Sequence, residues 1–173
     1  MIIDTKRLLI RPFTVDDSTL ILRLLNEPSF IENIADRGVR NLDDAEKYIL
    51  EGPVASYEKF GFGLSRISLR GIDIPIGMAG ILKRDFLEDV DLGYAFLPEY
   101  CGQGYAYEAA AALIEYAFNV LKLGKVVAIV SENNQASIKL LKKLGFRKNG
   151  LIKYPGDDSE VRLYIISRDG SGK

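Results

Sequence analysis

A glycine-containing loop joins a strand pattern to a long helix pattern at residues 97–108, so a helix must pack back on a sheet in this chain. Gly102 and Gly104 stand where the strand pattern ends, and the helix pattern that follows is rich in alanine. Glycine lets the backbone approach a ligand closely, and the first N–H groups of a helix have no partner within it. Such amides bind phosphate without a basic side chain. The segment therefore predicts either a phosphate-binding loop or a turn that only ends a strand.

Two common nucleotide-binding motifs do not fit this loop. A dinucleotide fingerprint needs a third glycine or alanine where this chain has Tyr107, and it opens a βαβ unit, whereas residues 97–108 follow a β-meander. A P-loop needs Gly-Lys-Ser/Thr at its end, and that sequence is absent here.

Hydrophobic periodicity and turn residues divide the rest of the chain into short elements. The expected strands cover residues 8–12, 62–69, 76–83, 89–97, 126–130, 146–154 and 161–167. The expected helices start near Thr14, Asn41, Tyr105 and Asn134, the second with a kink at Gly52-Pro53 and the third reaching residue 123. This order predicts an α/β (α+β) fold: a mostly antiparallel central sheet of about seven strands, four or so flanking helices and one parallel crossover. We expect residues 1–168 to form one domain and residues 169–173 a flexible tail.

The composition excludes several classes of chemistry. The chain has no histidine and a single cysteine, Cys101, so a histidine-based triad and a histidine or cysteine zinc site are excluded, and no metal is expected. One thiol suits a reducing cytoplasm, and the sequence contains neither a signal peptide nor an apolar run of about 20 residues. Lys and Arg number 23 against 24 Asp and Glu, which predicts no nucleic-acid partner.

A second segment, residues 133–146, follows the short strand after the alanine-rich helix and should lie beside the loop. Together the two segments resemble the GNAT superfamily of N-acetyltransferases. In that family the phosphate loop reads Gln/Arg-x-x-Gly-x-Gly/Ala, and the downstream helix starts with Asn-x-x-Ser/Ala and ends near Lys-x-Leu-Gly-Phe. The matching positions are Cys101, Gly104, Ala106, Asn134, Ser137 and residues 142–146.

The likeness covers most of the chain and extends to the branch that acetylates ribosomal-protein N-termini, which also holds enzymes acting on polyamines and antibiotics. Residues 5–12, 91–94 and 98–109 are similar to that branch. Cys101 departs from the pattern, because the superfamily has Gln or Arg there and this branch often has Trp. The contact at that position is expected to be made by the backbone, so cofactor binding should tolerate the change.

The resemblance implies acetyl-coenzyme A as the cofactor, with its thioester between two splayed strands. Backbone amides at the end of the strand 89–97 would hold the pantetheine arm and the carbonyl, and amides of the glycine loop would hold the pyrophosphate. The implied cofactor-binding residues are Ala95, Phe96, Leu97, Gly102, Gln103, Gly104, Tyr105, Ala106, Asn134 and Ser137.

Acetylation of an amine needs a base for the amine proton and stabilisation of the leaving thiolate. Asp91 is the candidate base, with Glu88 and Asp89 as neighbours, because the family's strand often carries Glu before the Gly-Tyr pair. The alternative is that these are solvated carboxylates of a turn and a strand edge. Ser137 is the candidate acid, since many family members use a tyrosine where this chain has Leu141. The alternative is a first-turn serine that bonds to the backbone.

The acceptor pocket is expected between the first two helices and the strand faces. The candidate residues are Phe30, Ile34, Arg37 and Tyr94, with Arg40 and Phe86 as further possibilities. The alternative is that residues 36–40 only cap the second helix.

These residues lead to a prediction of function. We expect direct acetyl transfer from acetyl-coenzyme A to a primary amine, either a protein N-terminus or a small molecule. No histidine is present to activate Cys101, so an acetyl-cysteine intermediate is not expected. The alternative from another class is a non-catalytic acyl-coenzyme A sensing or binding module. The resemblance also implies a monomer or a homodimer.

Overall fold

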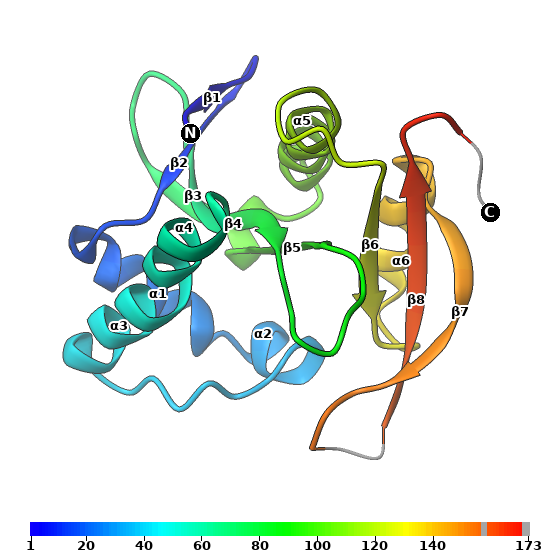
Figure 1. The fold of residues 1–173 in the computed structure, drawn as a ribbon. Coiled ribbons are helices and arrows are strands. Elements are labelled where there is room, and N and C mark those ends of the chain that lie inside the picture. Colours follow the sequence, from blue (N-terminus) through cyan, green and yellow to red (C-terminus); the bar gives the residue numbers. More distant parts are fainter. Residues whose placement is uncertain (157–158, 171–173) are drawn as a thin grey trace.

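A computed structural model describes residues 1–156 and 159–170, and its strands form one eight-stranded sheet (Figure 1). Neighbouring strands in the sheet follow the order β1-β2-β3-β4-β5-β6-β8-β7. The strands are β1 (Ile3–Asp4), β2 (Leu8–Pro12), β3 (Leu64–Leu69), β4 (Pro75–Leu82), β5 (Asp91–Phe96), β6 (Lys125–Val130), β7 (Arg147–Lys153) and β8 (Glu160–Ser167). Every neighbouring pair is antiparallel except β5 and β6, so the predicted parallel crossover is confirmed.

Helices and short helical turns connect the strands. They are α1 (Ser18–Leu25), α2 (Pro28–Asn33), α3 (Leu42–Ile49), α4 (Ala55–Phe60), α5 (Tyr105–Asn119) and α6 (Gln135–Lys143), with 3₁₀ turns at Val15–Asp17 and Pro98–Tyr100. Side-chain caps explain two of the starts: the Asn41 side chain accepts the Asp44 N–H at 2.8 Å, and that of Asn134 accepts the Ser137 N–H at 3.2 Å. Pro53 lies inside a π-helical turn, Leu50–Val54, which separates α3 from α4 where the kink was expected.

The two faces of the sheet carry separate hydrophobic cores. On one face, β-strand side chains pack with Ala109, Leu113 and Ile138 of α5 and α6. On the other face, Met78 and Leu97 pack with side chains of α1 and α3. Alternate residues of β5 therefore point to opposite cores, and this strand can present groups to both sides of the sheet.

The pairing of β5 with β6 is short. The two strands share a single registered pair, Asp91 with Val127, and the Val127 N–H donates to the Val90 carbonyl at 2.9 Å. By contrast, β5 pairs with β4 through all six of its residues, and β6 pairs with β8 through all six of its own. Beyond Asp91 the edge of β5 that faces β6 is therefore open, which leaves a gap within the sheet.

The sequence missed two elements and misplaced some boundaries. β1 was too short to give a pattern, so the sheet has eight strands instead of about seven. α2 was not expected, and it starts at Pro28, because proline suits the first turn of a helix. The strand expected over 89–97 begins only at Asp91, and α5 ends at Asn119 instead of residue 123. The expected tail begins with a turn in which the Gly170 N–H donates to the Ser167 carbonyl, and residues 171–173 lie outside the described residues.

Candidate active site

The loop between β5 and α5 presents a row of unpaired backbone amides. After the 3₁₀ turn at Pro98–Tyr100, Gly102 and Gly104 adopt left-handed φ angles of 74° and 82°. Among the residues that the structure describes, no backbone carbonyl accepts the N–H groups of residues 102–107. Free amides at the start of a helix of this length form an anion site without a basic side chain. This geometry fits a phosphate-binding loop better than a turn that only ends a strand.

Arg7, at the connection of β1 and β2, holds this loop from outside. Its backbone N–H and its Nε donate to the two carboxylate oxygens of Glu108 at 2.7 and 2.6 Å, and its Nη1 donates to the Gln103 carbonyl at 2.9 Å. The guanidinium also lies 4.5 Å from the ring centre of Tyr105. Partial burial would raise the pKa of Glu108, but hydrogen bonds from Thr5 and Arg7 hold it below its usual value. The first turn of α5 is therefore fixed to the N-terminal strands.

The backbone of β5 offers particular amides to the gap. The Leu97 N–H donates to the Ile76 carbonyl of β4 at 2.9 Å and is thus engaged within the sheet. Because N–H groups alternate sides along a regular strand, the amides of Tyr94 and Phe96 face β6, whereas that of Ala95 faces β4. Of the three amides expected to hold the pantetheine arm, only that of Phe96 points into the gap.

Two hydroxyl groups meet beside the gap on the face covered by α5 and α6. Ser137 Oγ in the first turn of α6 lies 2.5 Å from Tyr94 OH of β5. Burial raises the pKa of Tyr94, and the hydrogen bond to Ser137 offsets this only in part, so the phenol is protonated at neutral pH. The Ser137 hydroxyl is therefore bonded to a side chain and not to the helix backbone. Tyr94, which was expected to line the acceptor pocket, lies instead with the candidate acid.

Asp91 lies where the gap begins and is 1% exposed. Both of its carboxylate oxygens accept from Arg84 Nε at 3.0 Å. Burial raises the pKa of Asp91, and the positive charge of Arg84 opposes that rise. Asp89 precedes β5 and pairs with Lys125 at 3.0 Å, while Glu88 is exposed in the preceding loop. Asp91 is thus the one fully buried member of this acidic group.

The residues expected to bind the acceptor divide into core and surface. Phe30 is 5% exposed and packs in the core of α1 and α3, so it does not line a pocket. Ile34 is 43% exposed. Arg40 pairs with Asp36 at 2.6 Å, and its backbone N–H donates to Asp44 of α3, which agrees with a capping role for this part of the loop. Arg37 is exposed and forms no hydrogen bond or ion pair with any described residue.

Tyr48 of α3 is a partly buried tyrosine on which the charges of Arg37 and Arg84 act. It packs against the core of α1 and α3, burial raises its pKa, and the charges of Arg37 and Arg84 act in the opposite direction. Phe86, from the loop that carries Arg84, meets the Tyr154 ring edge-on with 5.2 Å between ring centres.

Comparison with known proteins decides the family. Residues 7–147 match the model of the acetyltransferase (GNAT) domain. The chain belongs to the GNAT family of acetyltransferases. It is 32% identical to the uncharacterized N-acetyltransferase YnaD of Bacillus subtilis over 153 residues, which are 88% of this chain and 86% of YnaD. It is an acetyl-coenzyme A-dependent N-acetyltransferase, and a purely sensory module is not supported.

Two further likenesses are narrower. RimL, a ribosomal L7/L12 α-N-protein acetyltransferase solved in complex with coenzyme A, has the same fold, with a TM-score of 0.84, 18% identity and coverage of 99% of this chain and all of RimL. Spermidine N(1)-acetyltransferase of Escherichia coli is 43% identical over 53 residues, which are 31% of this chain and 28% of that enzyme. The first likeness concerns the fold alone, and the second covers one segment.

The backbone amides and side chains of the GNAT site fit acetyl-coenzyme A. The free amides of residues 102–107 suit the pyrophosphate, and the amide of Phe96 faces the gap that would take the pantetheine arm. The α6 start, with Asn134 and Ser137, lies across that gap from Tyr94. When bound, the cofactor supplies an activated acetyl thioester. Among the described residues there is no group of His, Cys, Asp or Glu suited to a metal ion, and no helix long and apolar enough to cross a membrane.

Sequence reasoning missed three residues that shape this GNAT site. Arg7 was noted only as part of a family-like segment, and its partner Glu108 is 101 positions away. Neither Tyr48 nor Arg84 was singled out as a site residue. No local pattern signals these contacts, because each joins segments that are distant in sequence.

Proposed function

We propose that this GNAT enzyme transfers an acetyl group from acetyl-coenzyme A directly to a primary amine, either a protein N-terminus or a small-molecule amine. One observation supports it most, namely which groups surround the gap between β5 and β6. The Asp91 carboxylate lies where the two strands separate, the Ser137 and Tyr94 hydroxyls lie on one side, and the free amides of residues 102–107 lie beyond the end of β5. These are the groups that amine acetylation requires.

Asp91 is proposed as the base. An α-amine has a pKa near 8, so it needs only modest help to lose its proton at neutral pH. A buried carboxylate with a raised pKa can take that proton through one water molecule while Arg84 keeps it ionised. As the C–N bond forms, the amine proton passes to Asp91 and then to solvent.

Ser137 and Tyr94 are proposed as the acid. As the C–S bond breaks, Ser137 donates a proton to the departing sulfur, the Tyr94 hydroxyl replaces it along the hydrogen bond between them, and Tyr94 then regains a proton from solvent. This pair supplies a phenol although position 141, where many relatives carry a tyrosine, is a buried leucine. A thiol of pKa near 8.5 leaves without a strong acid, so the contribution should be moderate.

Transfer without an acetylated enzyme is proposed because Cys101 is poorly suited as a nucleophile. Its thiol points to the Leu97 carbonyl at 3.6 Å. Partial burial raises the pKa of Cys101, and the charge of Glu99 acts in the same direction. The thiolate, which is the reactive form, is therefore disfavoured.

A panel of amines tests the proposal. The enzyme is incubated with acetyl-coenzyme A and N-terminal peptides, polyamines or aminoglycosides, and both free thiol and acetylated product are measured. We expect amine-dependent thiol release matched by acetylated amine. Thiol release that no amine increases would contradict the proposal.

A further inference from the structure

The three strands beyond the gap, β6, β8 and β7, have a described helix on only one face. Tyr164 of β8 and Phe146, just before β7, belong to the core formed with α5 and α6. The side chains that alternate with them point the other way, where Figure 1 shows β8 with no helix in front of it, while α6 lies behind. We call this second side of the three strands the open face. Its apolar side chains are Val127, Ile129, Ile152, Val161, Leu163 and Ile165.

These apolar side chains form one patch. Ile129 of β6 lies directly opposite Leu163 of β8, and Val161 of β8 lies opposite Ile152 of β7. Side chains at such positions are in contact across the strands. In the part of the chain that the structure describes, all four are half-buried, and neither of the two cores includes them. A contiguous apolar surface of this kind marks a place where a ligand or a partner binds.

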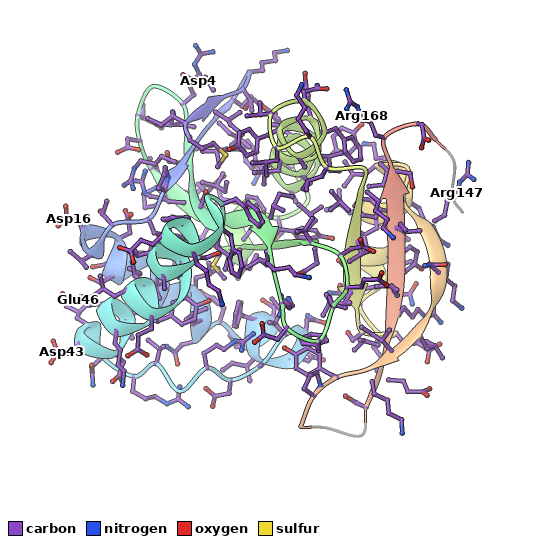
Figure 2. The ribbon with its side chains drawn as sticks, in the orientation of Figure 1. Asp4, Asp16, Asp43, Glu46, Arg147 and Arg168 are labelled. Atoms are coloured by element: carbon purple, nitrogen blue, oxygen red, sulfur yellow. The ribbon has the colours of Figure 1, made fainter. Side chains whose placement is uncertain are left out.

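The patch is continuous with the proposed base. Asp91 of β5 pairs with Val127 of β6, Val127 pairs with Ile165 of β8, and Ile165 pairs with Arg147 at the outer edge of the sheet (Figure 2). Paired residues point to the same face, so the Asp91 carboxylate belongs to the same side of the sheet as Ile165. With strands about 4.8 Å apart, Ile165 is roughly 10 Å from Asp91 along this row.

The next row lies alongside the gap. The parallel strands β5 and β6 separate after Asp91, and Ile129 with Leu163 follow Val127 and Ile165 in that direction. An amine that reaches Asp91 from the open face therefore has these apolar side chains beside it. The nearest charge on β6, that of Lys125, is already paired with Asp89 at 3.0 Å. Such a surface favours an apolar group and offers no partner to a second ammonium group.

We infer that the open face binds the acceptor, and that the acceptor carries an apolar group within about 10 Å of its primary amine, the span of this row. Leu163 and Ile129 would set that specificity. The inference rests on the proposed function, since it assigns the substrate class of the same site. A second copy of the chain seated here would cover the row that begins at Asp91, so an acceptor is the favoured occupant. A peptide N-terminus followed by an apolar residue and a small alkyl amine share this chemistry.

Matched acceptors test the inference. One pair of peptides differs only in Leu or Ser after an N-terminal alanine. A second pair is heptylamine and the chain of equal length in which two methylene groups are replaced by ether oxygens. We expect kcat/KM to be about tenfold higher for the apolar member of a pair, the lower end of what hydrophobic contacts give to specificity. Added salt should leave this preference in place, because it does not depend on charge. The pair with the larger kcat/KM shows whether a peptide or a small amine is the source.

Variants of the open face locate the preference. Leu163→Thr and Ile129→Thr both keep a β-branched residue in the strand and should each reduce the preference toward parity. Leu151→Thr is the matched control, since Leu151 is 54% exposed and pairs with Arg162, on the other face of the same strands. The control should keep the preference.

Several results would overturn the inference while the proposed function stands. They are equal kcat/KM within both pairs, a preference that salt abolishes, and a preference that survives in both open-face variants. Analytical ultracentrifugation adds one more: a dimer that Leu163→Thr dissociates would show that a second copy occupies the open face. Failure to acetylate any amine would instead overturn the proposed function, and the inference with it.

Discussion

At the scale of single residues, the contact of Ser137 with Tyr94 makes the sharpest prediction. If the pair gives a proton to the leaving sulfur, Ser137→Ala should lower kcat by roughly ten- to a hundredfold, toward the weak end of general-acid effects, because a thiol is a good leaving group. Tyr94→Phe should lower kcat by less. The double variant should be no worse than Ser137→Ala, since both residues act in one relay. Steady-state kinetics at saturating acetyl-coenzyme A measure this, with Tyr116→Phe on α5 as control.

Asp91 predicts a pH dependence. Only the ionised carboxylate accepts a proton, and burial raises its pKa, so kcat/KM should fall as the pH decreases through that raised pKa. Asp91→Asn can still accept a hydrogen bond from Arg84 but cannot take a proton. The fall of kcat/KM that is due to Asp91 should therefore disappear, and only the pH dependence from ionisation of the acceptor amine should remain. Asp16→Asn is the control, because its exposed side chain points outward from the turn before α1 (Figure 2). An unchanged pH profile in Asp91→Asn would rule out Asp91 as the base.

At the scale of elements, the N-terminus of α5 depends on a left-handed glycine. Gly104 has a φ of 82°, and an added Cβ would lie 3.2 Å from the Arg7 guanidinium. Gly104→Ala should therefore raise the KM for acetyl-coenzyme A and cost roughly 1–2 kcal/mol of stability. Gly71→Ala is a matched control, because its φ is 85° and its Cβ would meet nothing within 4 Å. Chemical denaturation and kinetics separate the two effects: both variants should lose stability, and only the first should lose affinity.

The tie from the N-terminal strands to α5 gives a second prediction at this scale. Arg7→Met removes the side-chain hydrogen bonds to Glu108 and Gln103 and keeps only the backbone one to Glu108, so the loop amides should become less ordered and the KM for acetyl-coenzyme A should rise roughly threefold to tenfold. Because Arg7 does not face the gap, kcat at saturation should change little. Lys6→Ala, an exposed neighbour, should behave as the wild type. A fall in kcat with an unchanged KM would show that Arg7 acts elsewhere.

Some helices, strands and contacts could be predicted from the sequence, and others could not. Long apolar periodicity and an asparagine cap located α5, α6 and the strand between them within a few residues, because these signals are local. β1 has two residues and α2 has six, so neither is long enough for its hydrophobic pattern to repeat twice. The contact of Tyr94 with Ser137 spans 43 positions and depends on how α6 docks on the sheet. Motif likeness could name both residues, but only the packed fold brings their hydroxyl groups together.

At the scale of the whole molecule, the groups proposed to act in catalysis lie on both faces of the sheet. The face with α5 and α6 carries the free amides and the hydroxyl pair, and the face with α1 and α3 carries Asp91 and its partner Arg84. The gap between β5 and β6 connects them. An acetyl-coenzyme A concentration of about 100 times its Kd should therefore stabilise the native state by about 2.7 kcal/mol, which a thermal-shift titration detects. The absence of any shift at saturating cofactor would contradict the placement of the cofactor site.

The most direct test of direct acetyl transfer is an initial-rate study in which acetyl-coenzyme A and an acceptor amine are varied together, with free thiol and acetylated amine counted in parallel. Direct transfer predicts intersecting reciprocal plots and one acetylated amine for each thiol released, with no acetyl group found on the protein by mass spectrometry. Parallel plots together with an acetyl group on Cys101 would contradict it.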